Sequence, residues 1–244
     1  MNNLKILKMK DKSDKYAIDK GLLFDLPFRL LLVMKTGGGK SNLIGNLFRD
    51  EFYGKDFKGD DIYIISPMMN DNKLNSLIDF KSVPEDNVMT SFDSDIISAL
   101  YDKLTEEFAE AVEKKKKPVQ SVIIMDDISW SGDLRKGNFN IVNKIFCNGR
   151  KHNISIIITS QFYKHILPSC RSQASGIIVG NTSEKQLKSI SDDNNYLEGG
   201  EKAFRSLFRK YVVEKHDFLI INYSNKFKDM YMDKDFNVIS KNSS

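Results

Sequence analysis

The stretch LLLVMKTGGGKSNLIGNLF, residues 30–48, combines the parts of a phosphate-binding loop. The apolar run at its start suits a buried strand. Gly37, Gly38 and Gly39 follow, and glycines let successive backbone N–H groups converge on phosphate oxygens without a clash from a Cβ atom. The amphipathic residues after them predict a helix, whose N-terminus adds partial positive charge. The stretch therefore predicts a strand, a loop and a helix built around an anion.

The residues beside these glycines have the chemistry that ATP and Mg²⁺ require. Lys40 can reach the β- and γ-phosphates, and the Ser41 hydroxyl can be a ligand of Mg²⁺. Against the pattern G-x-x-x-x-G-K-[ST], only the first position differs, because Met34 stands there. The alternative, a glycine-rich turn that precedes Lys-Ser by chance, is disfavoured by the strand before it and the helix after it. The expected phosphate-binding set is Thr36, Gly37, Gly38, Gly39, Lys40, Ser41 and Asn42.

A second apolar run, VIIMDD at residues 122–127, ends in two acids. In open parallel sheets, ligands bind outside the carboxyl ends of the strands. We expect Asp126 to hold Mg²⁺ through a coordinated water, and Asp127 to orient or deprotonate the water that attacks the γ-phosphate. Alone, the pair also fits two solvated aspartates at a strand exit. Its combination with the glycine loop favours the catalytic interpretation.

A third buried run, residues 154–159, is followed by Gln161. An amide at this place can donate to a γ-phosphate oxygen and accept from the attacking water, so Gln161 is the predicted γ-phosphate sensor; the alternative is a glutamine in a surface loop. Arg150 precedes the run and Arg171 follows it. Because a guanidinium donates in pairs and stays protonated, either arginine can neutralise phosphate charge, in its own subunit or in a neighbour.

Together the segments MKTGGGKS, VIIMDD and NGRKHNISIIITSQFYKHILPSCRS resemble viral genome-packaging ATPases of the FtsK–HerA superfamily, in its poxvirus-type and virophage branch. The resemblance covers roughly residues 30–180. It implies a RecA-like sheet in which the glutamine strand lies between the loop strand and the Asp-Asp strand. It further implies a homo-oligomeric ring, usually a hexamer, an arginine donated across subunits, double-stranded DNA in the centre and a viral capsid vertex as partner. The implied location is the host cytoplasm or the virion.

Length and composition fit one domain. The chain has 244 residues, of which 41% are hydrophobic and 29% charged, and its net charge of +4 permits a polyanionic partner without demanding one. No run of about 18 apolar residues predicts a membrane span. The 2 cysteines and 3 histidines have no metal-ligand spacing.

Strands and helices alternate along the chain, which predicts an α/β fold of the RecA-like P-loop NTPase type, with a mostly parallel sheet flanked by helices. We expect an N-terminal extension at 1–25, the ATPase domain at 26–224 and a polar, loosely held tail at 225–244. The expected strands are residues 29–33, 62–66, 122–126, 154–159, 176–179 and 218–222.

Positively charged segments are candidates for contact with DNA phosphates. The loop at 129–140, with Trp130, Arg135 and Lys136, follows the two acids directly. Residues 114–117 are lysines at the end of a long helical pattern. Arg205, Arg209 and Lys210 share a face of a C-terminal helical pattern. Each segment equally suits an ordinary solvated surface.

The sequence as a whole predicts an ATP-hydrolysing translocase that packages double-stranded DNA into a preformed capsid. Two alternatives share the glycine loop. One is a kinase for small molecules or nucleotides, which would need an arginine-bearing lid. The other is a scaffold that binds ATP and DNA but hardly turns over, and the arguments for it are Met34 and the short side chain of Asp127.

Overall fold

A sheet of eight strands, in the order β3-β2-β4-β5-β1-β6-β7-β8, forms the centre of the molecule. The computed structural model describes residues 13–67, 72–128 and 140–239. Strands β1 to β6 run parallel to one another, whereas β7 is antiparallel to β6 and β8 is antiparallel to β7. The strands are β1 (Arg29–Val33), β2 (Ile62–Ile65), β3 (Val88–Met89), β4 (Ser121–Met125), β5 (Ile154–Ser160), β6 (Gly176–Gly180), β7 (Phe218–Asn222) and β8 (Tyr231–Met232). The predicted α/β class with a mostly parallel sheet is confirmed.

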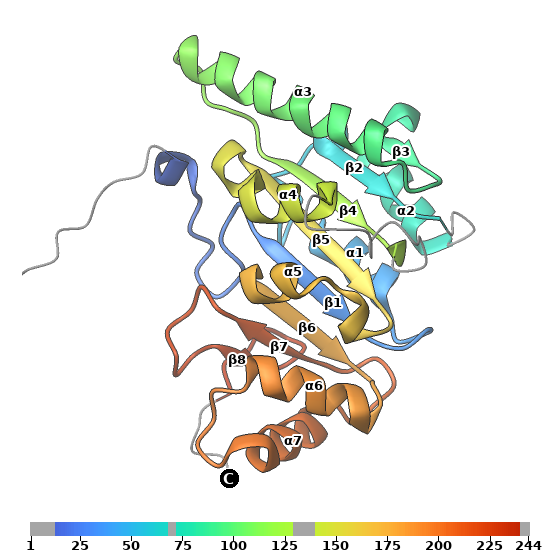
Figure 1. Ribbon diagram of the computed structural model, residues 1–244, viewed down its shortest axis with the longest axis vertical. Helices are drawn as coiled ribbons and strands as arrows, with labels where there is room; N and C mark the ends of the chain where they lie inside the picture. The colour runs from blue at the N-terminus through green and yellow to red at the C-terminus, as the bar shows by residue number, and fades with distance from the viewer. Residues whose placement is uncertain (1–12, 68–71, 129–139, 240–244) are drawn as a thin grey trace, which may run out of the picture.

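Helices cover both faces of this sheet (Figure 1). One core lies under α1 and α2, and the other lies under α3 to α7. Because both faces are covered, strands such as β4 and β5 are buried along their whole length, which explains their continuous apolar runs. The helices are α1 (Lys40–Leu47), α2 (Asn72–Lys81), α3 (Ser94–Glu113), α4 (Ile141–Asn148), α5 (Pro168–Gln173), α6 (Glu184–Asn194) and α7 (Gly200–Tyr211).

Local signals set the ends of several helices. The Asp93 side chain accepts hydrogen bonds from the N–H groups of Asp95 and Ile96 and so caps the start of α3. Helix α1 begins after Gly39 and ends at Leu47. Phe52 lies in the turn beyond its end.

Segments near both termini pack against the domain. In the N-terminal segment, Phe24 and Leu26 are buried, and Ile18 forms a bridge with Leu26. In the C-terminal segment, β8 pairs with β7, and Met232 is fully buried. The sequence predicted a loosely held tail from residue 225, whereas the structure makes residues 230–239 part of the fold.

The described helices include none that is long and apolar enough to cross a membrane.

Candidate active site

The strand order brings the predicted motifs to one edge of the sheet. Strand β5 lies between β4 and β1, as the family resemblance implied. In this parallel register Val33 pairs with Ser160, and Met125 pairs with Ile158. The carboxyl ends of all three strands therefore lie side by side, and the loops that follow them carry Lys40, the two aspartates and Gln161.

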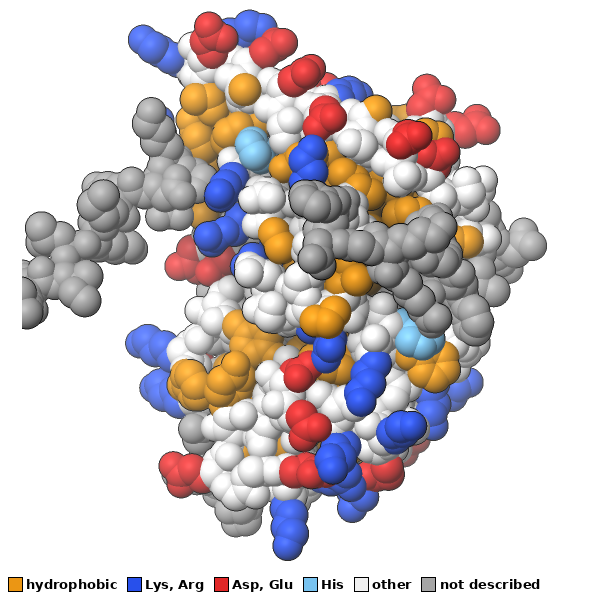
Figure 2. Space-filling view, viewed as in Figure 1, with side chains coloured by type: hydrophobic (Ala, Val, Ile, Leu, Met, Phe, Trp, Pro, Cys, Tyr) orange, Lys and Arg blue, Asp and Glu red, His pale blue; other side chains and the backbone are white. Residues whose placement is uncertain are grey.

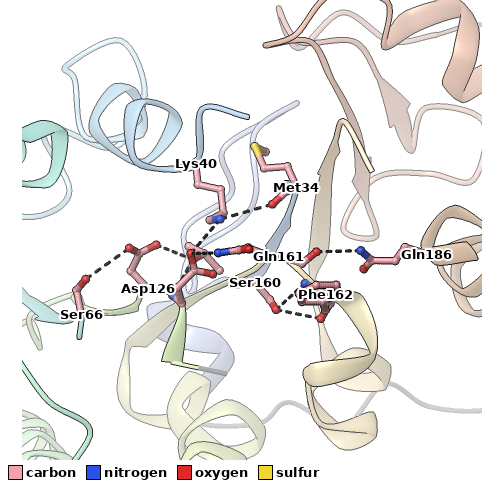
Figure 3. Close-up of polar contacts among 10 residues, drawn as sticks. Met34, Lys40, Ser66, Asp126, Ser160, Gln161, Phe162 and Gln186 are labelled. Carbon is pink, nitrogen blue, oxygen red and sulfur yellow. Dashed lines mark hydrogen bonds and ion pairs between the residues drawn. The ribbon is translucent and has the colours of Figure 1, made fainter. Parts of the chain in front are cut away.

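Lys40, Asp127 and Gln161 converge on one another. The Lys40 ammonium lies 3.1 Å from Asp127 Oδ2, and both side chains are buried. The Gln161 amide donates to the same oxygen at 3.2 Å. Lys40 Nζ also lies 3.5 Å from the Met34 carbonyl oxygen (Figure 3). A single carboxylate oxygen thus lies between the predicted phosphate-binding lysine and the predicted sensor.

The backbone of Asp127 is in the left-handed region, with φ of 48°. Its N–H donates to Thr159 Oγ1 at 3.0 Å, which holds the turn in place. The other carboxylate oxygen, Oδ1, is buried without a hydrogen-bond partner among the described residues. A buried acceptor without a donor is unfavourable. Asp127 Oδ1 is therefore available to accept a hydrogen bond from a water or a ligand.

Two hydroxyl groups hold Asp126, and the sequence did not single them out. Thr159 Oγ1 donates to Asp126 Oδ1 at 2.6 Å. Ser66 Oγ lies 3.5 Å from Asp126 Oδ2, at the outer limit of a hydrogen bond (Figure 3). The available signal was position: Ser66 follows β2, and Thr159 lies near the end of β5.

The glycine loop adopts backbone conformations that favour glycine. Gly37 and Gly39 have φ of 71° and 103°, which side chains with a Cβ rarely adopt. Gly38 has no positive φ, but a Cβ there would lie 2.9 Å from the Lys35 carbonyl oxygen. Thr36 and Asn42, the outer members of the predicted set, are both exposed.

Met34 is buried where the usual pattern has glycine. Its side chain packs beside Gly180, the last residue of β6, where an added Cβ would lie 2.9 Å from Met34 Cβ. A methionine is accommodated because the neighbouring strand ends in a residue without a side chain.

Gln186 of α6 is hydrogen-bonded to the backbone of Gln161. The Gln186 amide donates to the Gln161 carbonyl oxygen at 3.0 Å (Figure 3). The Gln186 side-chain oxygen accepts from the Tyr163 N–H at 2.7 Å. Ser160 Oγ and the Phe162 backbone exchange a further pair of hydrogen bonds. These contacts fix the backbone on either side of the predicted sensor and connect it to α6.

The two candidate arginines do not join this cluster. Arg150 lies in the turn at Gly149–His152, before β5 begins, and so at the opposite edge of the sheet from Gln161. Arg171 forms an ion pair with Asp193 and lies 4.9 Å above the ring of Tyr163. This placement disfavours a role for Arg150 at the phosphates of its own subunit, and Arg171 is engaged in the contact with Asp193.

The candidate DNA-binding segments have mixed outcomes. Trp130, Arg135 and Lys136 lie outside the described residues. Lys114 pairs with Glu110. Arg205 and Arg209 both pair with Glu184 of α6. Figure 2 shows basic and acidic side chains interspersed over α6 and α7, so this surface is not a continuous basic patch.

Residues 15–243 match the family model described as Poxvirus A32 protein. The chain belongs to this family. A comparison with curated protein sequences gives no match. Membership in the A32 family confirms the poxvirus-type resemblance of the three motifs.

Solved structures share the fold of this A32-family chain. The genome packaging NTPase B204 from Sulfolobus turreted icosahedral virus 2, in complex with AMP, aligns with a TM-score of 0.56 at 18% identity, over 81% of this chain and 93% of that one. The DNA-packaging ATPase B204 from Sulfolobus turreted icosahedral virus aligns with a TM-score of 0.53 at 19% identity, over 82% of this chain and 94% of that one. The cytoplasmic domain of the Type VII secretion ATPase EccC from Thermomonospora curvata aligns with a TM-score of 0.52 at 13% identity, over 81% of this chain and 24% of that one. At these identities the likeness establishes the fold.

Proposed function

We propose that this protein hydrolyses ATP and uses the energy to move double-stranded DNA into a preformed viral capsid. The observation that carries the proposal is the shared oxygen of Asp127, which contacts both Lys40 and Gln161. Three polar side chains from separate motifs, buried or partly buried, meet at one point beside a glycine loop. Membership in the A32 family and the fold shared with B204 support the packaging role.

The chemistry follows from the side chains at this point. ATP phosphates in the glycine loop would draw Lys40 away from Asp127, because a triphosphate has more negative charge than one carboxylate. Asp127 would then be free to orient the attacking water and take its proton, while the Gln161 amide contacts the γ-phosphate. The convergence therefore suits hydrolysis by water.

Ser41 and Asp126 are the residues that would hold Mg²⁺. The described residues contain no group of three or more His, Cys, Asp or Glu suited to a metal. Mg²⁺ in nucleotide sites needs less, because phosphate oxygens and water fill most of its coordination sphere. The oxygen donors on this edge of the sheet, Ser41, Ser66, Asp126 and Thr159, fit that chemistry. When bound, the ion would neutralise charge that develops on the phosphates.

The proposed assembly is a homo-oligomeric ring, with six subunits as the expected number, DNA in its centre and the capsid vertex as its docking partner. Arg150 is the better candidate for an arginine donated across subunits. It lies away from its own active site, and no described residue forms an ion pair with it. The published names of the B204 structures, which specify genome and DNA packaging, support the DNA partner.

The rate of ATP hydrolysis, measured with and without duplex DNA, tests this function. Lys40→Ala and Asp127→Asn should each lower the DNA-stimulated rate by about 100-fold or more, because each removes a group that acts on the phosphates or the water. Asp102→Asn is the matched control, since Asp102 forms an exposed pair with Lys144, and should leave the rate unchanged.

Two results would contradict the proposal. Phosphoryl transfer to nucleosides rather than to water would indicate the kinase alternative. Tight ATP binding with no DNA-stimulated turnover, on material shown by light scattering to be assembled, would indicate the scaffold.

A further inference from the structure

A pocket of about 500 Å³ opens directly beside the glycine loop, and none of the catalytic residues named above lines it. One wall is the loop and the first turns of α1. The other wall comes from the start of β7 and the turn after β8. Ligand pockets typically have volumes of about 300–1,000 Å³, so this one suits a small molecule. Its lining includes Gly38, Gly39, Asn42, Asn46, Phe52, His216, Phe218, Lys234 and Phe236.

A tight turn before β7 covers the glycine loop. The Asp217 carboxylate accepts hydrogen bonds from the N–H groups of Val213 and Glu214, at 3.2 Å and 2.8 Å. Its other oxygen accepts from Lys234 Nζ at 2.7 Å, which ties the turn to the segment after β8. One buried carboxylate thus positions both C-terminal segments of the pocket.

This turn brings two cationic or polar groups to the loop. Lys215 Nζ lies 3.8 Å from the position that a Cβ on Gly37 would occupy. His216 Nδ1 lies 3.4 Å from the equivalent position on Gly39. Among the described residues, no carboxylate forms an ion pair with Lys215, so its charge is free to act on an anion in the loop.

Aromatic rings make the rest of the pocket apolar. The rings of Phe52 and Phe236 lie 5.4 Å apart, and both are partly exposed. Phe218 is also partly exposed at the start of β7. Flat aromatic walls bind the flat face of a heterocycle by stacking, whatever its hydrogen-bonding edge.

We propose that this pocket binds the base and ribose of the nucleotide, and that Lys215 is a second cation on its phosphates. The inference rests on the proposed function only for the placement of phosphates in the glycine loop. It assigns a nucleotide-binding role to the turn before β7 and to the segment after β8, which the sequence motifs did not include.

A second cavity, of about 570 Å³, lies on the other side of α1 and is the competing location. It meets the phosphate-binding set only at Ser41 and Asn42, and its lining includes the acids Asp50 and Glu51. Arg49 accompanies these acids, and the first pocket includes Asp235 beside Lys234, so the charges of the linings do not separate the two cavities. The first pocket is favoured because it meets the glycine loop at Gly38 and Gly39, where His216 also lies. The exposed Phe80 lines the second cavity and supplies a matched control.

Titration calorimetry with two probes, Mg-ATP and inorganic triphosphate, separates the two parts of the proposal. The wild-type protein should bind ATP more tightly than triphosphate, because only ATP fills the pocket. Phe236→Ala should lower the affinity for ATP about tenfold and leave the affinity for triphosphate unchanged. Lys215→Ala should lower the affinity for both probes about threefold to tenfold, because the Lys215 ammonium acts on the phosphates that both probes share.

Controls match each variant. Lys202→Ala removes an exposed lysine from α7, and Phe80→Ala removes the aromatic ring of the second cavity; neither should change either affinity. If Phe236→Ala fails to fold by circular dichroism, Phe236→Leu keeps an apolar side chain there and should still weaken ATP alone.

The results distinguish this inference from the proposed function. Unchanged ATP affinity in the Phe236 and Lys215 variants, or a loss in Phe80→Ala instead, overturns the pocket assignment while hydrolysis stands. Pocket-dependent ATP binding by a protein that never hydrolyses ATP upholds the pocket and overturns the motor.

Discussion

The pairing of Met34 with Gly180 shows how one residue in a motif depends on another far along the chain. Met34 occupies the first position of the loop and is fully packed. It fits because Gly180, at the end of the adjacent strand, leaves space for its side chain. The two positions therefore form one packing unit.

Gly180→Ala should destabilise the protein by about 1–3 kcal/mol, because its Cβ would be forced to within 2.9 Å of Met34 Cβ. Urea denaturation measures this change. Gly45→Ala is the control: a Cβ at Gly45 meets nothing within 4 Å, and alanine in a helix is favoured over glycine. In the Met34→Gly background, which removes the Met34 Cβ together with the rest of the side chain, Gly180→Ala should cost less. Additive costs would contradict the packing unit.

The short turn at Gly149–His152 shows how one element supports its neighbours. The His152 ring makes edge-on contacts with Tyr101 and Phe108 of α3, at centroid distances of 6.3 Å and 5.6 Å. Burial lowers the pKa of His152, and the charge of Lys151 lowers it further. The folded protein therefore prefers the neutral imidazole under α3.

The free energy of unfolding should consequently fall as the pH drops below about 6.5, the ordinary pKa of histidine. Above that pH, His152 is neutral in both states and its contribution is complete. Below it, the unfolded chain binds a proton that the folded chain resists until the lowered pKa is passed. Urea titrations at pH 7.5 and pH 5.5 measure the difference.

His152→Phe should reduce this loss, because the phenyl ring keeps the contacts without titrating. His165→Asn is the control and should leave the loss unchanged. An identical pH dependence in His152→Phe would contradict the assignment to this turn.

At the scale of the whole molecule, the C-terminal segment belongs to the folded unit and also contributes to the proposed nucleotide pocket. Strand β8 extends the sheet beyond β7, and Met232 is part of the core shared with α1 and α2. Loss of this packing should therefore affect the stability of the entire domain.

Met232→Ala should lower the free energy of unfolding by about 2–5 kcal/mol, the usual cost of truncating a buried methionine. The transition should remain a single one, because the segment shares its core with α1. Leu22→Ala, at a side chain that is 49% exposed, is the control and should change little. A change below about 0.5 kcal/mol would mean that the tail is an independent appendage.

Much of the fold was predictable from the sequence because its signals are local. The apolar runs predicted every strand from β1 to β7 except the two-residue β3, and the glycines and Lys-Ser predicted the loop. Short strands such as β3 and β8 have too few residues to show a periodicity. They form because neighbouring strands offer them unpaired backbone groups.

The sequence by itself determined which residues are candidates for the chemistry. Lys40, Ser41, the two aspartates and Gln161 all follow a strand or a glycine turn, so local backbone preference places them just beyond the strand ends. Only the tertiary structure decided which hydroxyls hold Asp126, that Arg150 lies at the far edge of the sheet, and that the C-terminal strands close a pocket beside the loop. Those facts depend on the register between segments far apart in the sequence, such as Arg29 with Ile156 and Gly176 with Asn222. Backbone propensity acts over a few residues. The packing of a sheet between two layers of helices instead depends on all of its strands together.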